Sequence, residues 1–242
     1  MSDDARTLPV PGLRNGRDLG GLPRHDGTRT PSGVFLRSEV PDLVDPAGWR
    51  VLIERGVRSV LDLREPAERS ARRSSPPAEV ADLHVPHDGL EHEAFWADYW
   101  DSGLAGTPVY YLPHLQQLPE RTVAVLSAIA VAPEGGLLLH CAGGRDRTGI
   151  ISAVLLRIAG ATDDAITDDY LASIANASAL AAARGRPDEE PAVAALLASR
   201  GTDSEEAFRA FLAGLDVDAL LADLPVEQAS ALRTWRGALP VA

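Results

Sequence analysis

Hydrophobic and polar positions in the first two thirds of the chain follow two alternating patterns. Short apolar runs typical of buried strands occur at Val34–Leu36, Val57–Leu63, Val80–Val85 and Leu137–Leu139. Helical patterns occur at Pro46–Arg55, which ends at Gly56, and at Arg121–Ala132 and Ile150–Ala159. Because strands and helices alternate, the sequence predicts an α/β fold with a small central, mostly parallel sheet flanked by helices.

The last third of the chain is helical in pattern. Ile150–Ala159 is apolar on nearly every face, which is typical of an interior helix. Thr162 is the expected N-cap of the next helix. Residues 176–238 should form a helical C-terminal part, interrupted at Gly185–Pro187, Gly201 and Pro225. With 242 residues and no internal repeat, we expect one domain that spans residues 1–242.

Residues 86–118 have the least regular pattern and hold half of the aromatic side chains. These are Phe95, Trp96, Tyr99, Trp100, Tyr110 and Tyr111. We expect a helical, lid-like insertion here. Two interpretations remain open: the segment covers a site, as long irregular segments often do, or it is a surface excursion packed on the core.

Composition and charge exclude several classes of function. The net charge of -12 argues against a nucleic-acid binder and against adhesion to anionic membranes. The single cysteine, Cys141, excludes an internal disulfide. The apolar runs are too short to span a membrane, and the first ten residues show no signal-peptide pattern, so we expect a cytoplasmic protein.

The segment from His140 to Gly149 carries the candidate chemistry. It reads His-Cys-Ala-Gly-Gly-Arg-Asp-Arg-Thr-Gly and lies between an apolar strand and an apolar helix. A glycine-rich loop that opens a helix can bind a phosphate through its backbone N–H groups. Arg145, Arg147 and the helix start favour the nucleophilic thiolate form of Cys141. A free cysteine is more often a small buried hydrophobic residue, but that does not explain the two glycines and two arginines beside it.

Two motifs resemble those of a known family. The loop is similar to HCxxGKDRTG, and Asn15–Gly21 is similar to NxRDxGG. Leu36–Ser38, Val60–Arg64 and Asp168–Leu171 resemble further segments of the same family, in the same order. The chain therefore resembles, over about residues 12–175, the bacterial tyrosine-protein phosphatase family that includes the mycobacterial protein tyrosine phosphatase B.

The resemblance implies a cysteine-phosphatase-like fold and an activity. A phosphotyrosine protein or peptide would be hydrolysed through a phosphocysteine, with inorganic phosphate as product and with no metal or other cofactor. Cys141 would attack phosphorus, Arg147 would clamp its oxygens, and Asp146 would be the general acid and then the base. Asp98 and Asp101 are rivals for the acid. The phosphate-binding residues would be Ala142, Gly143, Gly144, Arg145, Thr148 and Gly149.

Other residues are expected to support the loop from outside. His140 would orient it from behind, and Arg17 and Asp18 would brace it through hydrogen bonds, together with Asn15. Asp62 and Arg64, at a strand end, are expected to act similarly. His84, His87 and His92 have no metal-binding spacing. Asp188–Glu190 is expected to be a solvated helix start.

Several alternatives stay open. Arg145 replaces the lysine of the family loop, and an arginine is not interchangeable with a lysine. Activity on phosphoinositides, which is associated with a basic residue at this position, can therefore be either present or absent. Phosphoserine and phosphothreonine are further candidate substrates. A non-catalytic phosphate-binding module would not need Cys141, Asp146 and Arg147 together, and a sulfur-transfer enzyme would leave the Asn15–Gly21 element unexplained.

Overall fold

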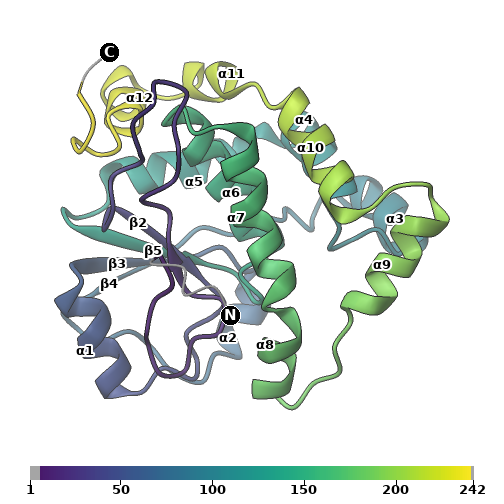
Figure 1. Cartoon of the computed structure of the whole chain (residues 1–242), viewed down its shortest axis with the longest axis horizontal. Helices are drawn as coiled ribbons and strands as arrows, with labels where there is room; N and C mark the ends of the chain where they lie inside the picture. Colours follow the sequence, from purple (N-terminus) through teal and green to yellow (C-terminus); the bar gives the residue numbers. More distant parts are fainter. Residues whose placement is uncertain (1–5, 241–242) are drawn as a thin grey trace.

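The computed structural model describes residues 6–240, and a five-stranded sheet forms its centre (Figure 1). The strands are β1 (Arg17–Asp18), β2 (Phe35–Ser38), β3 (Val57–Asp62), β4 (Ala81–His84) and β5 (Gly136–His140). Their spatial order is β1-β2-β5-β3-β4. Only β1 runs antiparallel to its neighbour, so the predicted mostly parallel sheet is confirmed.

The carboxyl ends of the four parallel strands lie in one row. Ser38 of β2 is in register with His140 of β5, His140 with Asp62 of β3, and Asp62 with His84 of β4. The polar residues that end these strands therefore meet at one edge of the sheet. In open α/β sheets this edge is where ligands bind.

Helices cover both faces of the sheet because its strand residues are apolar on both sides. Leu137 and Leu139 of β5 pack into one apolar cluster with α5 (Pro119–Val131) and α6 (Asp146–Ile158), whereas Leu138 packs into a second cluster with α1 (Pro46–Glu54). Figure 1 shows α1 on one side of the sheet and α5, α6 and α7 (Asp163–Ala175) on the other. The middle strand of such a sheet should be apolar throughout, as the three consecutive leucines are.

The helices before the C-terminal part are α1 (Pro46–Glu54), α2 (Pro66–Ser70), α3 (Glu93–Ser102), α4 (Tyr111–Gln117), α5 (Pro119–Val131), α6 (Asp146–Ile158) and α7 (Asp163–Ala175). Of these, α1, α5 and α6 agree within a few residues with the helices predicted at Pro46–Arg55, Arg121–Ala132 and Ile150–Ala159. The start of α6 was predicted too late, at Ile150, because the apolar run begins there, while its first turn consists of the loop residues Asp146–Gly149. Thr162 caps α7 as predicted, since its side chain accepts from the N–H of Ala165.

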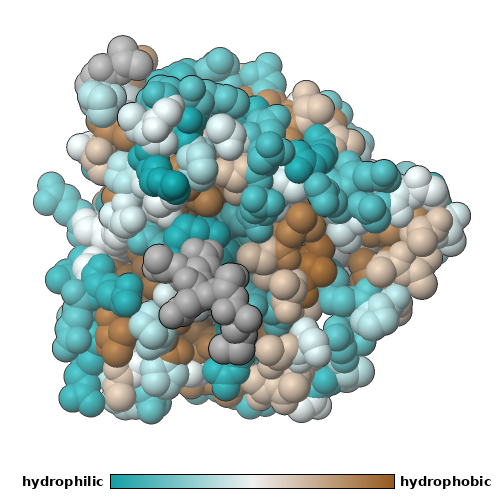
Figure 2. Space-filling model, viewed as in Figure 1, coloured by the Kyte–Doolittle hydropathy of each residue, from teal (hydrophilic) through white to brown (hydrophobic). Residues whose placement is uncertain are grey.

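The helical C-terminal part is also confirmed. It contains α8 (Ala177–Ala183), α9 (Glu190–Ser199), α10 (Ser204–Gly214), α11 (Val217–Ala222) and α12 (Val226–Arg233). In Figure 1 the chain passes from α8 to α9 along the edge of the molecule and then returns through α10 to α12, which packs near α5. Most residues on the face seen in Figure 2 are hydrophilic, and hydrophobic residues gather there only in small patches.

Residues 86–118 are more regular than their pattern indicated. They form α3, a 3₁₀ turn at Pro108–Tyr110 and α4. Phe95, Trp96, Tyr110 and Tyr111 are buried in the main apolar cluster, and of the six aromatic side chains only Trp100 is largely exposed. The arrangement agrees with a helical insertion packed on the core, and movement of this segment stays a prediction.

Within residues 6–240, none of the helices combines the length and the apolarity that a membrane-spanning segment needs. Met1 to Ala5, which belong to the segment expected to show no signal peptide, lie outside the described residues.

Candidate active site

Cys141 follows β5 directly and begins a loop that leads into the first turn of α6. The loop crosses the row of strand ends close to Ser38, and this crossing requires glycine at position 144. Gly144 has φ +70°, and a Cβ there would lie 2.4 Å from the carbonyl oxygen of Ser38. A side chain at this position would force the loop away from the sheet, because both the conformation and the space favour glycine.

Four consecutive carbonyls of the loop accept hydrogen bonds from surrounding residues. The pairs are Cys141 O with His140 Nδ1 (3.1 Å), Ala142 O with Val40 N (3.1 Å), Gly143 O with Asn15 Nδ2 (3.0 Å) and Gly144 O with Arg37 Nη2 (2.7 Å). In a planar trans peptide the next N–H points opposite to the carbonyl. The amides of residues 142–145 are therefore directed away from these partners, as an anion-binding loop requires.

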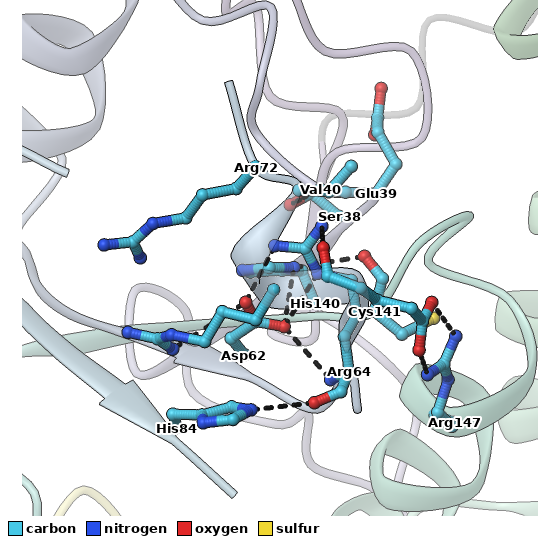
Figure 3. A network of polar contacts seen from close by, with 12 residues as sticks. Ser38, Glu39, Val40, Asp62, Arg64, Arg72, His84, His140, Cys141 and Arg147 are labelled. Atoms are coloured by element: carbon cyan, nitrogen blue, oxygen red, sulfur yellow. Dashed lines mark hydrogen bonds and ion pairs between the residues drawn. The ribbon is translucent and has the colours of Figure 1, made fainter. Parts of the chain in front are cut away.

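Arg147 lies beside Cys141 at the start of α6, as Figure 3 shows. Its Nη1 donates to Glu68 Oε2 (2.5 Å) and Asp88 Oδ2 (3.0 Å), and its Nη2 donates to Glu68 Oε1 (3.0 Å). A guanidinium has five N–H donors, so among the described residues Nε–H and one Nη2–H of Arg147 are left without a partner, and both lie on a single edge. That edge has the fork geometry that binds two oxygens of a phosphate.

Asp88 is a candidate functional residue that the sequence analysis missed. Burial, opposed by Arg147 and assisted by nearby Glu65, Glu68 and Asp146, raises the pKa of its carboxyl from 3.8 to about 7. The backbone of Asp88 is also fixed, since its carbonyl accepts from Trp96 Nε1 (3.1 Å) and its N–H donates to Glu65 (3.1 Å). The sequence does place Asp88 just after β4, at the same edge of the sheet as Cys141, and this position could have identified it.

Asp146 is held by two neighbours. Its Oδ1 accepts from the hydroxyl of Tyr111 (2.6 Å) and from Arg145 Nε (3.3 Å). Arg145 also donates to the carbonyl of Gly106 (2.6 Å) and to Glu190. The predicted loop arginine thus connects the insertion with α9, and Glu190 is not the freely solvated helix start that its acidic surroundings suggested.

The Asn15–Gly21 element reaches the loop through Asn15 and Arg17 rather than through Asp18. Asn15 bonds to the Gly143 and Gly144 carbonyls, and Arg17 Nη1 donates to Asn15 Oδ1 (2.6 Å). Asp18 instead accepts from the N–H groups of Gly20 (2.7 Å) and Gly33 (2.7 Å). The expected brace from Asp18 to the loop is therefore wrong, because the extended backbone of β1 points its side chain toward the Gly20 turn.

The remaining predicted support lies at the end of β3. Asp62 accepts two bonds from Arg64 (2.9 and 2.8 Å) and lies 3.9 Å from His140 Nδ1. Figure 3 shows this contact network, in which His84 also bonds to the Arg64 carbonyl (2.8 Å). These contacts fix the strand end next to Cys141.

Thr148 and Gly149 differ in what they offer a phosphate. The Thr148 hydroxyl is buried and has no hydrogen-bond partner among the described residues, so it is available. The N–H of Gly149 donates to the Arg145 carbonyl (2.7 Å) inside α6. The amide of Gly149 is therefore occupied inside the helix, contrary to the expected phosphate-binding role of this residue, and a Cβ placed at Gly149 would make ordinary van der Waals contact with Tyr170 (3.4 Å).

Other candidates lie away from the loop. Asp98 and Asp101 are exposed on α3 and make no hydrogen bond to the loop in the described part of the chain. Buried His87 bonds to Thr122 (3.0 Å), and His92 is exposed near Glu120. Across residues 6–240, no group of three His, Cys, Asp or Glu side chains is arranged to hold a metal ion.

Comparisons with known proteins agree with this geometry. A family model described as "Tyrosine phosphatase family" matches residues 8–219. The chain belongs to the tyrosine phosphatase family. The phosphatase class predicted from the two motifs is thereby confirmed. Residues 140–149, which carry the first of these motifs, are called the phosphatase loop.

Individual relatives are of modest identity. A protein of Cupriavidus necator whose name describes it as a tyrosine-protein phosphatase is 29% identical over 84% of this chain and 77% of its own length. The triple specificity protein phosphatase PtpB of Mycobacterium tuberculosis is 27% identical over 68% of each chain. The structure of P. aeruginosa TpbA with pTyr aligns with a TM-score of 0.44 and 19% identity, over 91% of this chain and 96% of that one.

Proposed function

We propose that this chain hydrolyses phosphotyrosine in a protein or peptide through a phosphocysteine at Cys141. The observation that carries the proposal is the loop itself, in which four carbonyls are bound from outside and the amides of residues 142–145 are turned the other way. Such preorganised donors stabilise charge that develops on equatorial phosphoryl oxygens. A thiolate at the first loop position supplies the nucleophile.

The reaction has two steps. The Cys141 thiolate attacks phosphorus, the bond from phosphorus to the tyrosyl oxygen breaks, and an acid protonates that oxygen. Water then attacks the phosphocysteine, a base takes its proton, the P–S bond breaks and inorganic phosphate leaves. Arg147 would hold two oxygens on the edge that Glu68 and Asp88 leave open. No step uses a metal or cofactor.

Asp146 is our first candidate for the acid and base, because it lies inside the loop and Tyr111 and Arg145 fix its carboxyl. Asp88 is a second candidate, favoured by its contact with Arg147 and by a pKa near the working range of a general acid. The roles of Asp146 and Asp88 can be distinguished with substrates that differ in their leaving group. Loss of the true acid should slow the hydrolysis of phenyl phosphate far more than that of an activated aryl phosphate.

A phosphoinositide substrate is the competing function. A cavity of about 470 Å³ lies beside the loop at Ala142, and its charged lining residues are Arg64, Arg73, Arg184, Arg186, Asp42 and Glu68. The arginines outnumber the carboxylates in this lining, so this side of the loop can attract a further anionic group. Activity on phosphoserine, phosphothreonine and inositol lipids is part of the same test.

The test is a panel of phosphotyrosine, phosphoserine and phosphothreonine peptides and inositol lipids, all with a chelator. Wild-type protein should turn over phosphotyrosine, and Cys141→Ser should abolish turnover while it still binds phosphate. Turnover retained by Cys141→Ser would exclude the covalent route. Preference for inositol lipids would replace the proposed substrate, and loss of activity with chelator would contradict a metal-free mechanism.

A cytoplasmic location stays a prediction from the sequence.

A further inference from the structure

A buried ionic cluster lies behind the phosphatase loop, with Asp169 of α7 at its centre. Its Oδ1 accepts from Arg17 Nε (2.9 Å) and Arg6 Nη1 (2.8 Å), and its Oδ2 accepts from Arg37 Nη1 (2.6 Å). Asp169, Arg17 and Arg37 are at most 3% exposed. Burial alone would raise the pKa of Asp169, but the three guanidiniums outweigh burial and lower it, so the carboxylate is ionised.

Two routes lead from Asp169 to the same loop carbonyl. On the first, Arg37 uses Nη1 for Asp169 and Nη2 for Gly144 O (2.7 Å). On the second, Arg17 donates to Asn15 Oδ1 (2.6 Å), which turns the Asn15 amide so that Nδ2 faces Gly143 O (3.0 Å) and Gly144 O (3.2 Å). Ser173, one turn further along α7, accepts from both guanidiniums (2.7 and 3.2 Å).

The direction of these carbonyls determines the direction of the amides that follow them. Since the peptide is planar, the bond to Gly143 O fixes the N–H of Gly144, and the bonds to Gly144 O fix the N–H of Arg145. We propose that Asp169 is a positioning residue, which holds Arg17 and Arg37 so that these two amides point at the phosphoryl group. The proposal rests on the phosphatase function proposed above.

Stability alone is a weak explanation for the cluster. A buried ion pair adds little net stability compared with apolar residues of the same size. Of the three arginines bonded to this carboxylate, the two most buried, Arg17 and Arg37, are also directed to the peptide whose N–H opens the helix at Arg145: Arg37 directly, and Arg17 through Asn15. Orientation of the loop explains why Arg17 and Arg37 share this acid.

The experiment compares Asp169→Asn and Asn15→Ala with a matched control on the same helix. Thr162→Ala removes the N-cap of α7, so it weakens that helix without touching the cluster. For each protein we would measure Tm, kcat and KM for an aryl phosphate, and the Kd of inorganic phosphate by calorimetry. Positioning effects through a neighbouring residue typically cost roughly 10- to 100-fold.

We expect both cluster variants to lose roughly 10- to 100-fold in kcat and to bind phosphate more weakly. The double variant should lose less than the product of the two single losses, because both act on the same peptides. Thr162→Ala should lower Tm only. If Asp169→Asn does not fold, Asn15→Ala and Asn15→Asp test the positioning role. Asn15→Asp should lose more kcat and phosphate affinity than Asn15→Ala, because it turns an acceptor oxygen toward two carbonyl oxygens.

A folded Asp169→Asn with kcat and phosphate Kd within about twofold of the wild type would overturn the proposal, and if Asp169→Asn does not fold, the same result for Asn15→Ala would overturn it. The same losses in Thr162→Ala would also overturn it, since they would report helix stability only. Phosphate binding needs no turnover. A wild-type protein that binds phosphate but hydrolyses nothing would therefore reject the phosphatase function, and the affinities of the variants would still judge the positioning role.

Discussion

Replacement of Asp88 by asparagine should change how the stability of this protein depends on pH. The Asp88 side chain is 16% exposed and contacts Arg147 of α6. Burial, followed by the carboxylates of Glu65, Glu68 and Asp146, raises its pKa from 3.8 to about 7 even though Arg147 opposes the shift. Asparagine keeps the size and one acceptor oxygen but removes the proton.

The sign and the size follow from proton linkage. The folded state holds this proton more tightly than the unfolded chain does, so the stabilisation is complete below about pH 4 and is lost as the pH rises to about 7. A shift of about three pKa units corresponds to ~4 kcal/mol, of which about 3 kcal/mol is lost between about pH 5 and pH 8. Asp88→Asn should not show this loss.

Urea unfolding of both proteins at several values between about pH 5 and pH 8 measures the effect. The stability of Asp88→Asn relative to the wild type should increase with pH by about 3 kcal/mol. Burial lowers the pKa of His87 and of His114, and these groups titrate in both proteins, so their contributions cancel in the difference. Parallel curves would mean that Asp88 ionises as an exposed carboxyl does, and the reasoning from burial would be refuted.

Three further outcomes are expected. Gly144→Ala should abolish activity and lower Tm, because its Cβ would lie 2.4 Å from the Ser38 carbonyl oxygen; an active, equally stable variant would show that the loop can move off the sheet. Trp235→Ala should cost about 3–5 kcal/mol in urea unfolding, since large buried aromatic side chains cost this much; Trp235 is fully buried against Phe35, and a loss below about 1 kcal/mol would contradict its place in the core. Hydrogen peroxide should inactivate the wild type in a way that thiol reductant reverses, with no internal disulfide in the mass spectrum, because Cys141 is the single cysteine; inactivation unchanged in rate by phosphate would place the damage outside the loop.

The sequence predicted the central elements because local patterns determine them. The consecutive leucines before His140 are typical of a strand buried on both faces, and the apolar run from Ile150 is typical of an interior helix, and the structure has both elements there. The Gly-rich segment between them predicted an anion-binding loop for the same local reason. The insertion at residues 86–118 was harder, since its aromatic residues face a core that is formed by distant helices such as α10.

The sequence alone was enough to predict the loop with its candidate nucleophile, its arginine and the strand and helix on either side. The packing of the chain in space was needed to show which of the 35 acidic residues approach that loop. Glu68 and Asp88 reach Arg147 across 79 and 59 positions, and Asp169 reaches Arg17 across 152. Such partners are fixed by strand register and helix packing, which bring distant segments to one edge of the sheet, and no spacing along the chain records them.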